Sequence, residues 1–407
     1  MPDLGSLTRY TSRQDISDGE GRVMGEETRS VYLDNAATTY PKPEVTYEAV
    51  DGFMRGVGGS AGRSGHWRSV ETGRMVYAAR EAVASLLGAP DPLRLVFTRN
   101  ATEALNLAIQ GLLEPGDHVV TTSMEHNSVM RPLAAAGSRG ITSTAVRCAP
   151  DGRLDPPDLE KAIRSSTGLI VLNHVSNVTG TIQPLDEVAR IARAAGVPLL
   201  VDAAQSAGRL PIDISSSGVG LLAFTGHKEL FGPQGTGGLY IGAGLDPEPL
   251  CCGGTGSRSN ELEQPAELPE RYESGTLNAP GIVGLGAGAD FAARVGVDAI
   301  RSHELALLDG LVAGLAEMKN VKVHGPADLR DRVGILALTF ENATPPEVAA
   351  ALDSRFGIAV RAGLHCAPCA HQTIGTIATG ALRVSLSYMN SADDIDYFLE
   401  CLAELRL

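Results

Sequence analysis

The chain has 407 residues, of which 43% are hydrophobic and 20% are charged, and its formal net charge is −14. An acidic chain without a basic run is a poor ligand for nucleic acids or for an anionic membrane surface. The length is ample for a large core and indicates two domains, or one large domain with an annex. No apolar stretch approaches the roughly 20 residues of a membrane span, and six cysteines are too few for a disulfide framework. We therefore expect a soluble, cytoplasmic protein with reduced thiols.

The N-terminal segment differs in pattern from the rest of the chain. Residues 1–30 are polar, rich in Gly, Ser and Glu, and lack the apolar core of a secretory signal, so we expect a flexible N-terminal extension there. Beyond it, short apolar runs alternate with amphipathic segments of helix length. These runs lie at 93–97, 117–122, 168–176, 197–204, 219–224 and 237–242. Such runs are typical of strands buried on both faces, and the sequence predicts an α/β fold with a mostly parallel sheet between helices.

The pattern changes after a polar, turn-rich stretch at 253–281. A long helical segment follows at roughly 281–318, and after it a further apolar run at 332–340 and another helix. We predict a large domain at 31–285 and a smaller α+β C-terminal domain at 286–407.

Lys228 is the first candidate site residue. It follows the apolar run at 219–224 and stands beside several glycines, in a chain with five lysines among 34 basic residues. A lysine amine can deprotonate and attack a carbonyl, whereas a guanidinium cannot. The ordinary alternative is a solvated lysine in a turn, so the interpretation depends on the residues around it.

Other polar residues follow the neighbouring predicted strands, at the edge where open α/β sheets bind ligands. Asp202 ends an apolar run, where a buried carboxylate is costly unless it is paired. Ala101 and Thr102 begin a helix whose free N–H groups suit a phosphate. His126 and Asn177 end two more runs. Each has an ordinary structural alternative, namely a helix cap or a turn residue. Together, a lysine, a carboxylate, a histidine and a phosphate seat fit pyridoxal 5′-phosphate (PLP).

The order and spacing of nine motifs resemble the cysteine desulfurases, which are class V aminotransferases of PLP-dependent fold type I. The similarity is closest to the SUF-type and selenocysteine-lyase-like group and runs from residue 31 to the C-terminal helix. The motifs are FTRNATEALN, MEHNSV, SNVTGT, VDAAQ, FTGHK, GPQGTGGLY, RYESGTLN, RAGLHCAPCAH and LRVSLSYMN. The resemblance implies a sheet of the seven-stranded type sandwiched by helices, with the catalytic cysteine loop in the smaller C-terminal domain.

The resemblance also implies a role for each matching residue. Lys228 would hold PLP covalently and move protons, Asp202 would keep the pyridine nitrogen protonated, and His126 would stack on the ring. Gln205 would bind the ring hydroxyl, and the other cofactor contacts would come from Ala101, Thr102, Asn177, Thr225, His227 and Thr276. Thr276 would arrive from the second subunit of a homodimer. The substrate would be bound by Asn35, Asn177, Arg361 and Arg383, since an arginine fork suits a carboxylate.

Cys366 would supply the step that distinguishes this family. The resemblance implies that its thiolate, favoured by His365 and Arg361, attacks the sulfur of L-cysteine and leaves a Cys366 persulfide and L-alanine. A small buried hydrophobe is one alternative for this cysteine. Redox or metal use is another, because Cys366 and Cys369 have a C-x-x-C spacing with His365 and His371 nearby.

The cysteine segment is compact and lacks the Ser/Gly-rich insertion of the housekeeping desulfurases. This resemblance to the second group implies a sulfur-accepting partner protein, with the sulfur used for iron–sulfur clusters or other sulfur biosynthesis. Cys369 and the vicinal pair Cys251–Cys252 depart from the pattern, and a persulfide relay, a metal or no role at all stay open for them.

Other functions remain open on the same fold. Selenocysteine lyase, cysteine sulfinate desulfinase and biosynthetic C–S lyase activity would need only PLP and Arg383. A vestigial sulfur-carrier scaffold is the non-enzymatic alternative, which an intact Lys228, Asp202 and His126 disfavour. We expect no metal and no nucleic-acid or membrane partner.

Overall fold

The computed structural model describes residues 29–62, 64–258 and 260–406. Apart from Arg29 and Ser30, the extension expected at 1–30 lies outside the described residues. Among the described residues, no helix combines the length and the apolar composition needed to cross a bilayer.

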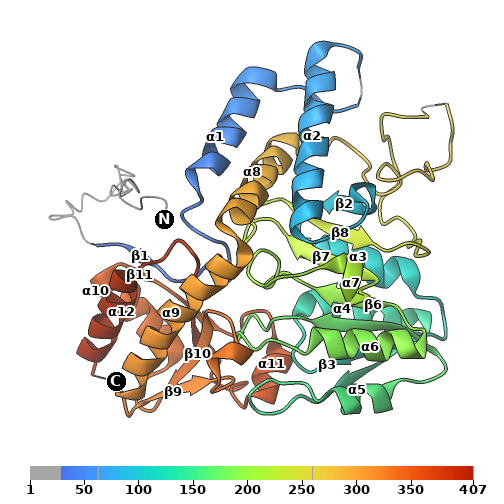
Figure 1. Cartoon of the computed structure of the whole chain (residues 1–407). Helices are drawn as coiled ribbons and strands as arrows, with labels where there is room; N and C mark the ends of the chain where they lie inside the picture. Colours follow the sequence, from blue (N-terminus) through green and yellow to red (C-terminus); the bar gives the residue numbers. More distant parts are fainter. Residues whose placement is uncertain (1–28, 63, 259, 407) are drawn as a thin grey trace.

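A seven-stranded sheet with the strand order β2-β8-β7-β6-β5-β3-β4 forms the centre of the larger part (Figure 1). Strands β3 to β7 pair in parallel, and β8 runs antiparallel to both of its neighbours. The bounds are β2 (Leu95–Thr98), β3 (His118–Thr122), β4 (Thr142–Val146), β5 (Thr167–Asn173), β6 (Leu199–Asp202), β7 (Leu221–Thr225) and β8 (Gly237–Ile241). The predicted α/β class with a mostly parallel sheet is confirmed.

Successive residues of the central strands point to opposite faces, so the sheet has a separate core on each side. Val119 and Leu200 pack on one face with helices α3 and α4, whereas Val120 and Leu199 pack on the other face with α2, α5, α6 and α8. This explains the continuous apolar runs in the sequence. The bounds are α2 (Trp67–Leu86), α3 (Ala101–Leu112), α4 (Asn127–Ala136), α5 (Pro156–Ala162), α6 (Leu185–Ala195) and α8 (Ala279–Val295).

The C-terminal part contains a four-stranded antiparallel sheet with the order β12-β13-β10-β9, and its core includes side chains of α9, α10 and α12. The predicted smaller α+β part is therefore present. The bounds are α9 (Val297–Ala316), β9 (Val321–His324), β10 (Ile335–Phe340), α10 (Pro345–Phe356), β12 (Arg361–Gly363), α11 (Pro368–Thr373), β13 (Ala381–Ser385) and α12 (Ala392–Glu404).

The remaining elements are short or peripheral. They are β1 (Val31–Tyr32), α1 (Glu44–Gly52), the π-helical turn η2 (Phe53–Val57), α7 (Ile214–Ser217), β11 (Ile358–Ala359) and the 3₁₀ turns η3 (Pro92–Arg94), η4 (Gly137–Arg139) and η5 (Leu329–Asp331). Helices α1, α2 and α8 stand together at the top of the molecule (Figure 1).

The division into domains at 31–285 and 286–407 stays a prediction. Two features of the chain bear on it. The predicted boundary lies within α8, and the helix is interrupted only at Gly296, before α9 begins. In addition, β1 pairs in parallel with β11, so the first strand lies with the C-terminal part of the chain.

A buried ion pair attaches the segment before α8 to the sheet. Arg80 on α2 donates from both terminal nitrogens to the Glu273 carboxylate, at 2.7 and 2.8 Å, and the backbone N–H of Phe97 donates to the same carboxylate at 2.7 Å. The two charged side chains are only 3% and 5% exposed. Removal of one charge would therefore leave the other buried without a counterion.

We predict that Glu273→Gln lowers the free energy of unfolding by about 3 kcal/mol, because the Arg80 guanidinium loses its counterion in a dry environment. Urea unfolding of the variant and of the wild type measures this difference. The matched control is Glu71→Gln, which breaks an exposed pair with Arg74 on the same helix, where Arg74 is 78% exposed. The control should cost less than about 1 kcal/mol. Equal costs for the two variants would contradict the prediction.

Candidate active site

Lys228 lies in a tight turn just after β7. The Phe231 N–H donates to the Lys228 carbonyl and the Gly232 N–H donates to the Gly226 carbonyl, each at 2.8 Å. Gly226 is required, since a Cβ atom there would lie 2.2 Å from the hydroxyl of Thr236. The turn leaves the Lys228 side chain half-buried at the carboxyl edge of the sheet.

The surroundings of Lys228 favour its neutral form. Burial, with smaller contributions from nearby arginines such as Arg383, lowers its pKa to about 8, while the Asp202 carboxylate acts in the opposite direction. A substantial fraction of this amine is therefore unprotonated near neutral pH, as a nucleophilic lysine requires.

Asp202 and Gln205 lie on the neighbouring strand end. Asp202 closes β6 with 4% exposure and accepts the Ala204 N–H at 2.9 Å. Burial raises the pKa of this carboxyl, and the Ala204 N–H and Lys228 oppose the shift. The Gln205 amide donates to the Ala36 carbonyl at 2.9 Å, but its Oε1 is buried without a partner among the described residues. A ligand hydroxyl would satisfy that acceptor.

The start of α3 is the place where the sequence predicts a phosphate seat. Ala101 is the first helical residue and Asn100 caps the helix. The hydroxyls of Thr102 and Ser128 lie 2.7 Å apart, and Ser128 Oγ lies 2.9 Å from His126 Nδ1. The structure therefore connects two predicted site residues through Ser128, a serine that the sequence analysis did not identify.

His126 is a neutral, oriented ring. It caps α4, and its Nδ1 accepts the backbone N–H of Ser128 at 3.1 Å, which places the ring proton on Nε2. Burial lowers the pKa of His126 to about 4, with additional contributions from Lys228 and Arg361. A flat uncharged ring of this kind suits stacking on an aromatic ligand.

The remaining predicted cofactor residues are Thr225, His227 and Thr276, and they differ in burial and in hydrogen-bond partners. Thr225 is buried at the end of β7, with its hydroxyl 3.5 Å from the Thr236 carbonyl. His227 Nδ1 is buried without a partner among the described residues, and burial lowers the pKa of this ring to about 4. Lys42 donates to the His227 carbonyl at 2.6 Å. Thr276 is exposed.

Two of the predicted substrate-binding residues, Arg383 and Asn177, are engaged in hydrogen bonds within the chain. Arg383 is buried, and it donates to Asp34 at 2.6 Å and to the Asn177 carbonyl at 3.1 Å, which leaves its Nε without a partner. The Asn177 amide donates to the His365 carbonyl at 2.8 Å, so its unpartnered atom is the acceptor Oδ1. An acceptor does not bind a carboxylate. In this arrangement Asn177 suits a ligand hydroxyl better than the predicted substrate carboxylate.

Asn35 is used within the fold. Its amide donates to the Ser385 carbonyl at 2.9 Å and to Asn390 Oδ1 at 3.0 Å, and its oxygen accepts the Tyr40 N–H at 3.2 Å. The preceding residue, Asp34, is the one that reaches Arg383. The sequence analysis therefore missed Asp34, the direct neighbour of a predicted site residue.

The Cys366 loop adopts an unusual backbone conformation. His365 and Cys366 have positive φ angles of 50° and 56°, a region that costs a side-chain-bearing residue about 1–2 kcal/mol. The Asn127 N–H donates to the Cys366 carbonyl at 2.8 Å, and Asn177 holds the preceding carbonyl. Cys366 is exposed, and its sulfur lies 3.9 Å from Nη2 of Arg361.

His365 does not have the predicted contact with the thiol. Its Nε2 lies 3.2 Å from the Arg361 carbonyl and its Nδ1 lies 3.1 Å from His371 Nε2. Burial lowers its pKa to about 3, so the ring carries no positive charge that could favour a thiolate. Within the described residues, Arg361 is the only cation that hydrogen bonds with the Cys366 sulfur.

The remaining cysteines are placed differently from Cys366. Cys369 is half-buried, and burial followed by the nearby Glu125 raises its pKa. Cys251 and Cys252 are exposed in the segment before α8. Within the described part of the chain, no group of three or more His, Cys, Asp and Glu side chains could hold a metal ion.

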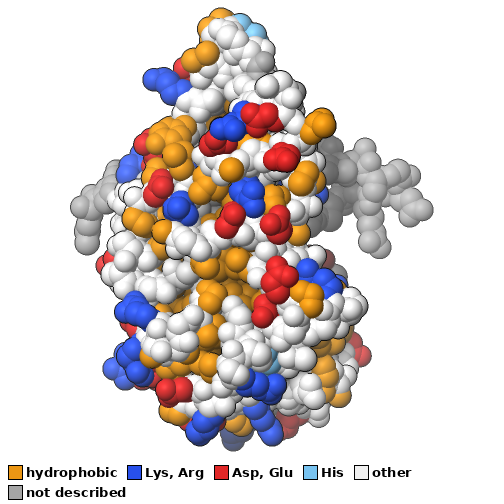
Figure 2. All heavy atoms as spheres, turned by 90° about the vertical axis from the view of Figure 1, so that its right-hand side faces the viewer, with side chains coloured by type: hydrophobic (Ala, Val, Ile, Leu, Met, Phe, Trp, Pro, Cys, Tyr) orange, Lys and Arg blue, Asp and Glu red, His pale blue; other side chains and the backbone are white. Residues whose placement is uncertain are grey.

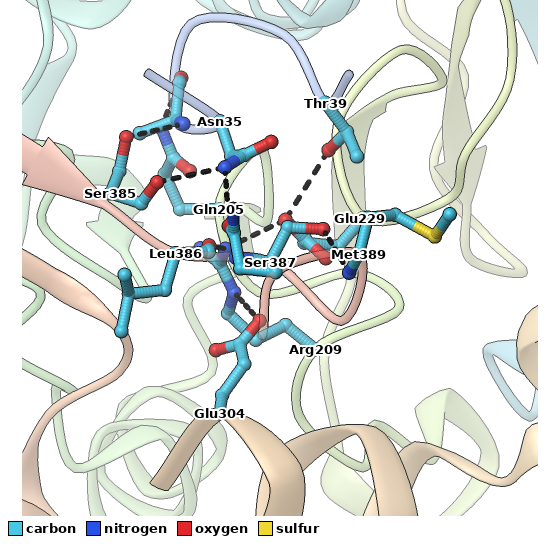
Figure 3. A network of polar contacts seen from close by, with 12 residues as sticks. Asn35, Thr39, Gln205, Arg209, Glu229, Glu304, Ser385, Leu386, Ser387 and Met389 are labelled. Atoms are coloured by element: carbon cyan, nitrogen blue, oxygen red, sulfur yellow. Dashed lines mark hydrogen bonds and ion pairs between the residues drawn. The ribbon is translucent and has the colours of Figure 1, made fainter. Parts of the chain in front are cut away.

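A buried ionic network lies behind the lysine turn (Figure 3). Arg209 donates to Glu229 at 2.7 Å, to Glu304 at 2.9 Å and to the Leu386 carbonyl at 2.8 Å. All three ionic side chains are at most 1% exposed. Burial raises the pKa of Glu229 to about 7, while Arg209 acts against the shift. Glu229 directly follows Lys228, Glu304 is on α9, and Leu386 follows β13, so Arg209 connects the lysine turn with the C-terminal part.

We predict that Lys228 of the cofactor-free protein reacts with an amine-directed acylating reagent in a profile that rises through a midpoint near pH 8, because only the neutral amine is nucleophilic. Peptide mass spectrometry at a series of pH values measures the rate for each lysine. Lys161 is the control, since its exposed pair with Asp158 raises its pKa above the ordinary value. Asp202→Asn should move the Lys228 midpoint to lower pH, because the carboxylate raises that pKa. Indistinguishable profiles for Lys228 and Lys161 would contradict the assignment.

Known proteins are similar to this chain in fold and in sequence. Residues 31–398 match the family model Aminotransferase class-V. A probable cysteine desulfurase of Methanothermobacter thermautotrophicus is 35% identical over 382 residues, which cover 92% of this chain and 94% of that protein. One of Halalkalibacterium halodurans is 37% identical over 375 residues, or 90% of each chain. The apo structure of cysteine desulfurase from Thermococcus onnurineus has a TM-score of 0.88 at 34% identity, covering 92% of this chain and 94% of that one. The chain belongs to the class-V aminotransferase family, in the group that contains the cysteine desulfurases.

Proposed function

We propose that this protein is a PLP-dependent cysteine desulfurase, a sulfurtransferase that converts L-cysteine to L-alanine and leaves the sulfur on Cys366 as a persulfide. The observation that carries the proposal is the exposed Cys366 thiol beside Arg361, on a loop held by Asn127 and Asn177 next to His126. The names of the similar proteins support the same activity.

The residues around Lys228 fit PLP. Buried polar atoms without partners among the described residues gather in this part of the chain, and each is costly unless a ligand satisfies it. They include Gln205 Oε1, Asn177 Oδ1 and His227 Nδ1. The Asp202 carboxyl, whose pKa is raised by burial, would regain its charge beside a protonated pyridine nitrogen. We therefore assign the cofactor to Lys228, Asp202, His126, Gln205, His227, Thr225, Asn177 and the start of α3 at Ala101 and Thr102.

When bound, PLP supplies an electron sink for the bonds around the substrate Cα. The chain's own residues would do the rest. The Lys228 amine, neutral in part near pH 8, takes the Cα proton and returns a proton to the substrate. The neutral His126 ring covers the cofactor face. Arg383 would bind the substrate carboxylate with the fork that now holds Asp34, so Asp34 must release it.

The transfer of sulfur from L-cysteine to Cys366 needs no external oxidant. The Cys366 sulfur forms an S–S bond with the substrate sulfur, whose bond to Cβ breaks, and Cβ receives a hydrogen to give alanine. The Cys366 thiol and L-cysteine therefore become the Cys366 persulfide and L-alanine. Arg361 would stabilise the attacking thiolate. The exposed position of Cys366 supports later transfer of the persulfide sulfur to an accepting protein. We assign both proteins to the cytoplasm.

We predict that Cys366→Ala abolishes alanine release from L-cysteine, while Cys369→Ala retains most of it, because only Cys366 is exposed beside Arg361. The measurement is alanine release from L-cysteine, L-selenocysteine and L-cysteine sulfinate by the wild type and both variants. Cys366→Ala should keep activity on the last two substrates, whose leaving groups need no attacking thiol. Loss of activity in the Cys369 variant alone would show that Cys366 is not the nucleophile. Full activity of both variants on L-cysteine would indicate a C–S lyase.

We also propose that the active unit is a homodimer in which Thr276 completes the neighbouring site. The segment that carries Thr276 is anchored by Glu273 but leaves the threonine exposed. On the face shown in Figure 2, exposed hydrophobic side chains are interspersed with charged side chains of both signs. Exposed apolar area of this kind is compatible with a subunit contact.

Mixing two inactive variants tests this arrangement. Lys228→Ala removes the amine, and Thr276→Asp places a negative charge beside the phosphate seat. If Thr276 acts across the interface, each mixed dimer regains one intact site, and about one quarter of wild-type activity returns on statistical exchange of subunits. The readout is alanine release after co-expression of the two chains, with light scattering to confirm the dimer. A monomeric chain, or a mixture without any recovered activity, would contradict the proposal.

A further inference from the structure

A chain of hydrogen bonds lies directly behind the Cys366 turn. It runs from Thr376 through His371 and His365 to the Arg361 carbonyl. The distances are 2.7 Å from Thr376 Oγ1 to His371 Nδ1, 3.1 Å from His371 Nε2 to His365 Nδ1 and 3.2 Å from His365 Nε2 to the carbonyl. The two imidazole rings stack at 5.3 Å between centroids, with an angle of 22° between their planes. The side chains of Thr376, His371 and His365 are all buried.

The Arg361 carbonyl, at the end of this chain, determines the direction of every hydrogen bond in it. A carbonyl oxygen only accepts, so His365 Nε2 carries a proton. Burial lowers the pKa of His365 to about 3 and that of His371 to about 4, so both rings are neutral and each has a single ring proton. His365 Nδ1 is then an acceptor and His371 Nε2 must donate to it. His371 Nδ1 accepts from the Thr376 hydroxyl in turn.

The backbone beside the chain needs such support. His365 and Cys366 both have positive φ angles, a conformation that persists only where the surroundings over-determine it. The carbonyls of these two residues accept from Asn177 and from the Asn127 N–H, which attach the turn to the larger part of the molecule. The histidine chain attaches it from the other side, to the strand that carries Arg361. The turn is therefore held from two directions, with the Cys366 side chain left exposed.

We propose that His371 is a positioning residue for the Cys366 thiol, which it holds beside Arg361 by donating a hydrogen bond to His365. The proposal rests on the proposed function, because it gives that position its purpose. His371 does not contact the thiol. It acts only through the orientation of His365 and of the backbone turn.

Three variants separate this role from general stability. His371→Leu removes both hydrogen bonds of the ring. His371→Gln keeps an N–H donor near the place of Nε2 and should rescue the position of the turn. Thr376→Val removes the hydroxyl that donates to His371 Nδ1, and it provides a second variant for testing if His371→Leu fails to fold. His118→Leu is the matched control, since His118 is a buried histidine between two threonines, at 2.9 and 2.8 Å, in the other sheet.

The first measurement does not depend on catalysis. Hydrogen exchange followed by mass spectrometry reports on the Asn127 N–H, which binds the Cys366 carbonyl, and on the Ala367 N–H, which binds the Leu364 carbonyl at 2.9 Å. In the holoenzyme, exchange at both amides should become at least about tenfold faster in His371→Leu and stay near the wild-type rate in His371→Gln and His118→Leu. Thr376→Val should lie between them. Unchanged exchange in folded His371→Leu and Thr376→Val would overturn the proposal.

The second measurement uses the substrates as a pair. L-cysteine needs the positioned thiol, whereas L-cysteine sulfinate releases its group without it. Alanine release from L-cysteine should therefore fall about tenfold or more in His371→Leu, with release from the sulfinate nearly unchanged. An equal loss on both substrates would make His371 a merely structural residue and overturn the proposal. If the wild type releases no alanine from L-cysteine, the proposed function fails, and the exchange rates still decide whether His371 holds the turn.

Discussion

The arrangement of the active site depends on one buried cation. Arg209 stands between the carboxylates of Glu229 and Glu304 and also binds the Leu386 carbonyl, all without contact with solvent. Desolvation of three charged groups is expensive, and their attraction compensates only when the geometry is held closely. The network is therefore a poor source of stability and a strong constraint on geometry. It sets the distance between the turn that carries Lys228 and the strand that carries Arg383.

This constraint matters because the proposed site is built from two parts of the chain that share no sheet. Lys228, Asp202 and His126 are placed by ends of the seven-stranded sheet, whereas Arg361, Cys366 and Arg383 come from the four-stranded sheet and its loops. A desulfurase must bring a thiol and an amine to the same small substrate. Small errors in such distances lower the reaction rate strongly. A rigid connection behind the site keeps the two groups at a fixed distance.

Much of this arrangement could be predicted from the sequence, where the signals are local. Apolar runs predicted six strands of the larger sheet but missed β4, whose residues are mostly exposed. Lys228 and Asp202 were identified by their positions after such runs. The pairing of Arg209 with Glu304 could not be predicted, because the residues are 95 positions apart and no local pattern marks either. The same reason explains Asn177, whose amide is taken by a carbonyl 188 positions away. Asp34 and Asn35 are neighbours, and only the fold decides which of them reaches Arg383.

The backbone register of the smaller sheet has an energetic consequence for the two arginines of the site. Arg361 and Arg383 stand directly opposite each other on β12 and β13. Burial lowers the pKa of Arg383, and the charge of Arg361 adds to this shift. Like charges at such positions repel. Replacing either arginine removes a useful contact and also relieves this repulsion, so each single substitution hides part of its own cost. Replacing both relieves the repulsion only once, and the loss then exceeds the sum of the two single losses. The two arginines therefore form one thermodynamic unit.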